Sequence, residues 1–116
     1  MRIRNFEIFE QQAKLCSMMA NAKRLAIVEI LKRGEASVGD IAGALGCTIS
    51  TASQHLRLMR DKQVVASRKD AQTVFYRLRN PKVVQCCHMV RELLLESFAA
   101  GSRMARDFDP DKLVED

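Results

Sequence analysis

A run of polar side chains at residues 48–57, TISTASQHLR, is the first candidate for chemistry. Ala52, Leu56 and Met59 share one face of the predicted helix, so the polar side chains are left on the other faces. Short donors and acceptors followed by cations suit a helix that enters the major groove of DNA, where polar side chains contact base edges and cations meet phosphate. The alternative is an ordinary helical hairpin with a solvated polar face.

Two helices joined by a tight turn must position this stretch. The first is predicted by one-face spacing of the apolar residues Val38, Ile41, Ala42 and Leu45. Gly46 falls where a chain leaves a helix with positive φ. Thr48 or Ser50 can then cap the second helix, because a hydroxyl satisfies the free N–H groups of its first turn. Two short helices with a glycine in the turn predict a helix-turn-helix within residues 37–65.

A basic β-hairpin is predicted directly after these helices. The pattern changes to alternation over Val64–Lys69 and Thr73–Leu78, with a turn at residues 70–72. Such a hairpin is a wing, whose tip can reach an adjacent minor groove and its backbone, although a plain solvated hairpin is the alternative. The residues predicted to contact DNA are Thr48, Ser50, Thr51, Gln54, His55, Arg57, Arg68, Lys69 and Gln72.

Helices are predicted on both sides of this unit. They cover Phe6–Ala20, Ala22–Lys32 with Asn21 as its cap, and a last helix that starts at Asn80-Pro81 and runs to about Arg106. The first and last helices carry long apolar seams, which predict that the last helix packs on the first helix of its own chain and of a second copy, in a two-fold dimer. The expected fold is therefore mainly α with a small β-hairpin wing, a winged helix-turn-helix that dimerises through its first and last helices. Residues 1–107 form one domain, and residues 108–116 a mobile tail.

Composition narrows the class of protein. A chain of 116 residues with 47% hydrophobic content predicts one folded domain, and a net charge of +5 favours an anionic partner. We expect a cytoplasmic protein with reduced thiols, since there is neither a membrane-length apolar run nor a signal-peptide pattern. The chain contains no nucleophile–base pairing, phosphate loop or supported carboxylate pair, so we expect no enzyme. The alternative function that does not involve DNA is a protein-interaction module, which would use the long apolar seam of the last helix.

Over roughly residues 10–98 the chain resembles the ArsR/SmtB family of dimeric winged-helix repressors. The resemblance is carried by MANAKRLAIVEIL, SVGDIAGALGCTISTASQHLRLMRDKQVV and AQTVFYRL, with Ser53-Gln54-His55-Leu56 and the basic wing as the most specific features. It implies a repressor that binds a palindromic operator as a homodimer and leaves it when an effector binds. In this family, the histidine equivalent to His55 more often braces the recognition helix than binds metal.

The chain departs from the family at three places. Ser37 and Gly39 stand where thiol sensors carry a Cys-x-Cys arrangement, so that site is absent. The positions that match the family's zinc site are Asn80, Lys82, Leu93 and Glu96. Lysine cannot replace histidine beside a cation and leucine offers no ligand, so this site is absent too. Gln63 stands where the family usually has glycine, which predicts a strained or altered exit from the recognition helix.

The cysteines are the remaining candidate site. In the implied fold the helices that carry Cys16 and Cys87 pack together, and Cys86 points about 100° away from Cys87 around its helix. Three thiolates could hold a soft ion such as arsenite, with His88 as a possible fourth ligand. Two alternatives stay open: a redox or persulfide switch in which Arg91 or His88 lowers a thiol pKa, and buried structural thiols. Cys47 has no expected partner and is assigned a structural role.

Overall fold

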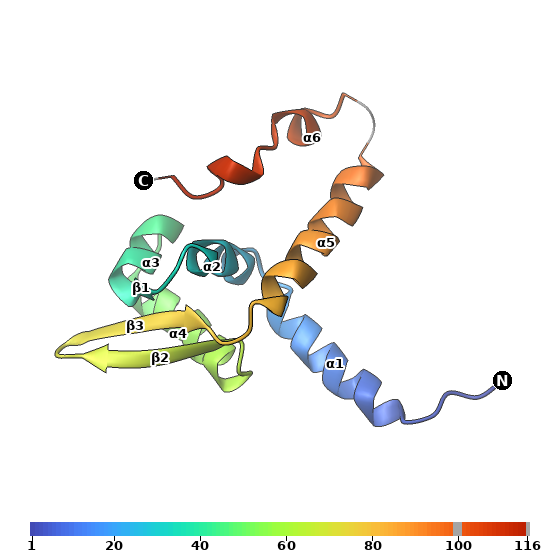
Figure 1. Ribbon diagram of the computed structural model, residues 1–116, viewed down its shortest axis with the longest axis horizontal. Coiled ribbons are helices and arrows are strands. Elements are labelled where there is room, and N and C mark those ends of the chain that lie inside the picture. The colour runs from blue at the N-terminus through green and yellow to red at the C-terminus, as the bar shows by residue number, and fades with distance from the viewer. Residues whose placement is uncertain (99–100, 116) are drawn as a thin grey trace.

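The computed structural model describes residues 1–98 and 101–115 and confirms the winged helix-turn-helix (Figure 1). Its helices are α1 (Phe6–Met19), α2 (Ala22–Lys32), α3 (Val38–Leu45), α4 (Ile49–Asp61), α5 (Lys82–Ser97), α6 (Arg103–Asp107) and the 3-10 turn η1 (Pro110–Lys112). Its strands are β1 (Ala36–Ser37), β2 (Val65–Asp70) and β3 (Thr73–Leu78), which form an antiparallel sheet in the order β1-β3-β2.

The core lies between α2, α3, α4 and one face of the sheet. Its largest fully buried side chains are Ile27, Val28, Ile41, Leu56, Met59 and Val65. On α4 the buried residues Ala52, Leu56 and Met59 are spaced four and three residues apart, and on the sheet Val65 and Tyr76 share the face that is turned to the helices. This packing fixes the helix-turn-helix and the base of the wing as one unit.

The predicted local signals at helix ends are confirmed. The Asn21 side chain accepts the first-turn N–H of Arg24 at 3.1 Å. Gly46 ends α3 with φ 67°, and Thr48, rather than Ser50, caps α4. Each of these residues satisfies backbone groups that a helix end leaves free, so the turn between α3 and α4 is set locally.

Strand β1 was not predicted. Residues 35 and 36 were expected only to lead into the helix-turn-helix, but Ala36 pairs with Tyr76 and Ser37 with Phe75. The Ser37 side chain also accepts the Asp40 N–H at 3.1 Å and so caps α3. Two residues are too few for an alternation pattern, which is why the sequence did not reveal this strand. It joins the first helix of the helix-turn-helix to the wing.

The prediction of one last helix to about Arg106 is wrong. Helix α5 ends at Ser97, Phe98 is extended with φ −77° and ψ 146°, and α6 begins only at Arg103. Gly101, with φ 87°, has a left-handed conformation that does not continue a helix. Residues 99 and 100, which the prediction also covered, lie outside the described residues. Beyond α6 the chain returns over α2 (Figure 1), while the mobile tail at 108–116 stays a prediction.

Apolar side chains on α1 and α5 are left uncovered by the single chain. Within the described residues, α1 buries only Met18 and α5 buries none. Phe6 and Leu93 are 64% and 68% exposed, and the two helices extend in different directions from the body (Figure 1). Across residues 1–98 and 101–115, no helix is both long enough and apolar enough to pass through a membrane. Because the apolar side chains of α1 and α5 are exposed, these two faces are candidates for contact with another protein surface.

Gln63 has the strained backbone conformation that was expected where the chain leaves α4. Its φ of 62° lies in the left-handed region, where a side chain costs about 1 kcal/mol. We expect Gln63→Gly to stabilise the fold by about that amount, a rise in Tm of roughly 4 °C. Urea and thermal unfolding at fixed protein concentration measure this change in the free energy of unfolding. The control is Lys62→Gly at φ −88°, where glycine should destabilise. Equal effects of the two substitutions would disprove the explanation.

Candidate nucleic-acid interface

Helix α4 presents a polar face to solvent. Ala52, Leu56 and Met59 are buried and hold the helix on the core, while Gln54 and Arg57 are exposed. Ser50 is exposed near the helix start and Thr51 is half-buried. The structure therefore places Ser50, Gln54 and Arg57 on the accessible side of one rigid helix, where their side chains can reach base edges and phosphate in a groove.

Thr48 caps the N-terminus of α4 beside this polar face. Its hydroxyl oxygen accepts the Thr51 N–H at 3.1 Å and lies 3.0 Å from the Thr51 hydroxyl. These contacts orient both side chains at the N-terminus of α4, where backbone N–H groups favour anions such as phosphate.

His55 joins α4 to α2. Its Nδ1 lies 3.3 Å from Nη1 of Arg24, whose Nε donates to the Met18 carbonyl oxygen. A guanidinium only donates, so Nδ1 accepts and the imidazole proton is on Nε2. Burial, followed by the charges of Arg24 and Lys23, lowers the pKa of His55 and favours this neutral form. The bracing role implied by the family resemblance matches this contact, and a role at DNA stays a prediction.

The wing separates its predicted contacts. Lys69 and Gln72 are exposed at its outer end, where Ala71 turns with φ 54°. Arg68 is exposed too, but its guanidinium binds both carboxylate oxygens of Glu35, with the shortest distance 2.6 Å. The structure thus brings α4 and the wing tip to the surface as separate groups, with one predicted wing cation already paired.

Known proteins with this arrangement identify the family. Residues 21–67 match the model described as bacterial regulatory protein, arsR family. The transcriptional activator HlyU of Vibrio cholerae is 37% identical over 83 residues, which are 72% of this chain and 77% of HlyU. The chain belongs to the arsR family. It is also 43% identical over 67 residues to the nodulation protein NolR of Rhizobium meliloti, covering 58% of this chain and only 55% of NolR.

A solved structure supports the same fold. The homodimeric winged helix-turn-helix DNA-binding domain of a possible ArsR-family regulator from Mycobacterium bovis superposes with a TM-score of 0.72 at 27% identity. The alignment covers 85% of this chain and 92% of that domain. The shared fold therefore extends over most of the chain, well beyond the residues 21–67 that match the family model.

The three candidate thiol ligands do not meet within one chain. Cys16 on α1 and Cys86 on α5 are exposed, and Cys87 is half-buried. Among residues 1–98 and 101–115, no three histidine, cysteine or acidic side chains lie in a group that could hold a metal ion. The expected packing of α1 against α5 is not found in the single chain (Figure 1), because the two helices diverge.

The expected lowering of a thiol pKa is wrong for Cys87. Burial and the neighbouring Cys86 raise the pKa of Cys87, and the opposing effect of Arg91 does not overcome them. Arg91 and His88 instead bind Glu29. Cys87 is therefore held as the neutral thiol, a form that is a poor nucleophile and metal ligand.

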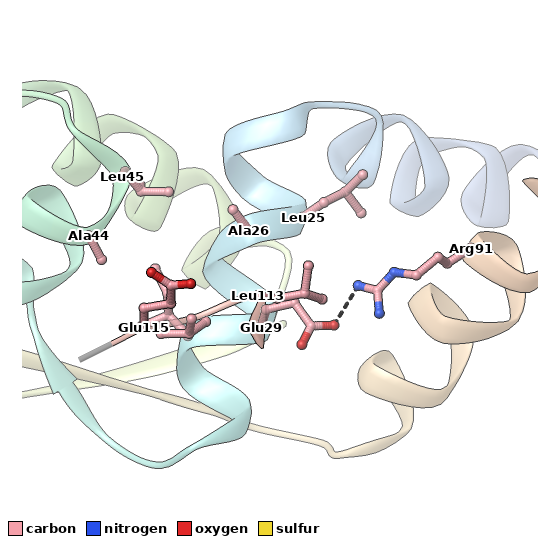
Figure 2. A pocket seen from close by; sticks show the side chains of 10 residues that line it. Leu25, Ala26, Glu29, Ala44, Leu45, Arg91, Leu113 and Glu115 are labelled. Atoms are coloured by element: carbon pink, nitrogen blue, oxygen red, sulfur yellow. Dashed lines mark hydrogen bonds and ion pairs between the residues drawn. The ribbon is translucent and has the colours of Figure 1, made fainter. Parts of the chain in front are cut away.

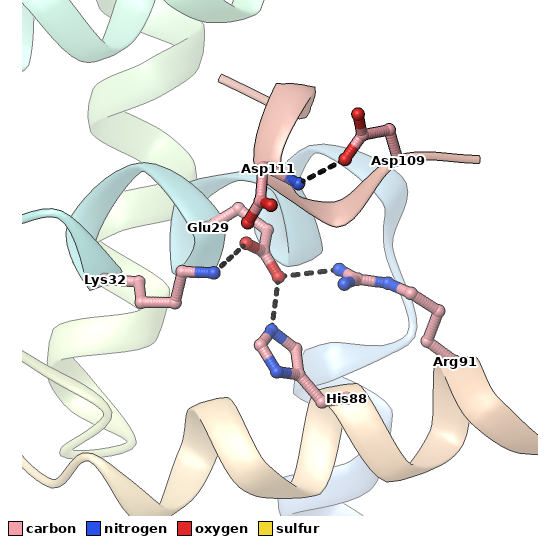
Figure 3. A network of polar contacts seen from close by, with 6 residues as sticks. All are labelled: Glu29, Lys32, His88, Arg91, Asp109 and Asp111. Carbon is pink, nitrogen blue, oxygen red and sulfur yellow. Dashed lines mark hydrogen bonds and ion pairs between the residues drawn. The ribbon is translucent and has the colours of Figure 1, made fainter. Parts of the chain in front are cut away.

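Glu29 is the centre of an ionic cluster that the sequence did not reveal (Figure 3). Its side chain is 8% exposed and binds Arg91 at 2.6 Å, His88 at 2.7 Å and Lys32 at 3.1 Å. Burial raises the pKa of Glu29, but these three partners outweigh it and lower the pKa to about 2. His88, expected to be either a fourth ligand or a solvated surface residue, is thus half-buried and paired with Glu29, while a role as a ligand stays a prediction. The cluster ties α5 to α2.

A cavity of about 270 Å³ lies beside this cluster (Figure 2). It is lined by Leu25, Ala26, Glu29, Ile30, Ala44, Leu45, Arg91, Leu113, Val114 and Glu115. Arg91 also places its guanidinium 5.3 Å from the ring centre of Phe108. The C-terminal segment therefore meets α2, α3 and α5 at one place, close to the link between α5 and the helix-turn-helix.

The Glu29 cluster makes stability depend on pH. A carboxyl whose pKa falls from 4.5 to about 2 on folding stabilises the protein above pH 4.5, and this is lost as the pH falls towards 2. We expect Glu29→Gln to cost about 2–3 kcal/mol at pH 7 and progressively less below pH 4.5. Urea unfolding from pH 7 to pH 3 measures this. The control Glu92→Gln changes an exposed carboxylate of α5. A pH-independent cost at Glu29 would contradict the cluster's role.

Proposed function

We propose that the protein is a transcriptional repressor that binds a palindromic DNA operator as a homodimer. The observation that carries the proposal is the exposed polar face of α4, held on the core by Ala52, Leu56 and Met59 and followed by the basic wing. In this proposal α4 enters the major groove and the wing lies along the neighbouring backbone. The protein acts in the cytoplasm and has no enzymatic activity.

The homodimer uses the uncovered apolar faces of α1 and α5. Val90, Leu93 and Leu94 are each at least half exposed on α5, and Phe6 and Phe9 are exposed on α1. Burying each such side chain contributes about 1.5–3 kcal/mol, so a two-fold contact of these faces is strongly favourable. Each protomer then reads one half-site, with centres about 34 Å apart.

Substitutions on α4 test DNA binding. We expect Gln54→Ala to weaken binding to the operator about tenfold with little effect on unrelated DNA, because it removes a base-edge contact. Arg57→Ala should weaken binding to both and reduce the slope of log K against log salt by about one. Fluorescence anisotropy with the protein's own upstream region measures both, and Lys112→Ala in η1 is the control. Salt-independent binding, or no effect of either change, would instead support a protein-interaction module.

The effector in this proposal is a soft thiophilic ion, such as arsenite, bound by Cys16, Cys86 and Cys87. Because the described residues of one chain hold no group of three such ligands, the ligands in this proposal come from both protomers, where α1 and α5 of two copies meet. Thiolates suit such ions better than hard cations do. The ion would alter the angle between α5 and α2 and so mismatch the two α4 helices with successive grooves.

Release from DNA distinguishes the candidate effectors. We expect arsenite to release reduced protein from its operator, and Cys86→Ser or Cys16→Ser to abolish release while leaving DNA binding intact. Cys47→Ser is the matched control, since Cys47 is half-buried in the turn before α4. Release by a persulfide donor or oxidant alone would make the protein a redox-responsive repressor. Binding unaffected by arsenite, persulfide or zinc would mean a constitutive repressor with structural cysteines.

A further inference from the structure

Arg68, Phe75 and Glu35 lie on one exposed face of the sheet. Arg68 pairs with Phe75 in the register of β2 and β3, and Phe75 pairs with Ser37 in the register of β3 and β1. Glu35 precedes Ser37 by two residues, which returns it to the same face. The three side chains therefore cross the whole sheet, from the wing strand β2 over β3 to the entry of β1.

The contacts among Arg68, Phe75 and Glu35 have specific geometry. The Arg68 guanidinium carbon lies 4.5 Å from the centre of the Phe75 ring, which is the position of a cation–π contact. Its Nη2 and Nε donate to Glu35 at 2.6 Å and 2.9 Å, a two-point pairing that only an arginine can make. Nη1 of the same guanidinium lies 4.0 Å from Asp70, so the arginine is held between the carboxylates of Glu35 and Asp70.

Glu35 is joined directly to the helix-turn-helix. The strand that follows it, β1, is only Ala36–Ser37, and Ser37 caps α3. A link from Arg68 to Glu35 therefore fixes the wing against the N-terminus of α3. The hairpin alone lacks such a restraint at its outer half, where residues 67–73 are exposed.

We propose that Glu35, Arg68 and Phe75 form a clamp that sets the direction of the wing, and that Arg68 is a positioning residue rather than a phosphate contact. This inference rests on the DNA-binding function proposed above. Lys69, which projects from the opposite face of β2 beside Val74, is then the cation of this strand that meets phosphate. Glu35 withholds the Arg68 charge from DNA and so limits binding to unrelated sequences.

The test compares neighbouring cations of one strand. Operator and scrambled duplexes are titrated by anisotropy over a range of salt. Lys69→Ala should reduce the salt slope by about one, whereas Arg68→Ala should leave the slope unchanged and weaken operator binding about fivefold. Glu35→Gln removes the closer of the two carboxylates and leaves only the 4.0 Å contact with Asp70, so it should steepen the slope by up to about one and tighten binding to scrambled DNA several-fold. The double variant Glu35→Gln with Arg68→Ala should restore the wild-type slope.

A second readout keeps the clamp testable without DNA. Amide hydrogen exchange in residues 66–77 should speed up at least threefold in Arg68→Ala and Glu35→Gln, less in Arg68→Lys, and not in Lys69→Ala. Equal slope losses in Arg68→Ala and Lys69→Ala, or unchanged exchange in the clamp variants, would overturn the inference. If the wild type shows no salt-dependent DNA binding but the exchange differences appear, the clamp stands and the proposed function fails.

Discussion

The buried carboxylate of Glu29 determines how the last helix leaves the body of the protein. Only Val83, Val84 and Cys87, in the first two turns of α5, pack beside the core. The next turn supplies His88 and Arg91 to Glu29 on α2. A charge buried to this extent is stable only while it is paired, so the three partners cannot separate without a large cost. The direction of α5 is thereby fixed relative to α2, which packs on both helices of the helix-turn-helix.

The direction of α5 explains why apolar faces of the single chain stay uncovered. Beyond Arg91, α5 carries Leu93 and Leu94 away from the core, and α1 does the same with Phe6 and Phe9. Apolar faces of this extent are not typical of a stable monomer. In a two-fold assembly the same helices would relate one α4 to the other. The Glu29 cluster would then transmit the geometry of the dimer to the DNA-binding face through α2.

The sequence predicted those features that depend on a few neighbouring residues. Gly46, Thr48 and Asn21 each act on the helix beside them, and the alternation in the wing strands was long enough to detect. Features that depend on distant partners were missed. The pairing of β1 needs β3, about forty residues away, and the roles of His88 and Arg68 follow from Glu29 and Glu35 on other elements. Glu29 resembles any other acidic residue of a helical pattern, and Glu35 lies in the short link between α2 and β1, so neither pair could be anticipated.

The cysteines show the same difference between local features, which the sequence predicts, and contacts between distant elements, which it does not. Helical spacing correctly placed Cys16 on α1 and Cys86 and Cys87 on α5, but a ligand set depends on how the helices meet, and in one chain they diverge. Thiol ligation across protomers would have to draw α5 towards a partner's α1, against the restraint that Glu29 places on His88 and Arg91. Binding at the sulfurs and binding at DNA would then be coupled reciprocally, since both act on the angle between α5 and α2. The raised pKa of Cys87 acts on the ion alone: ligation must remove the thiol proton at a half-buried site, which lowers the affinity for the ion and makes it rise with pH.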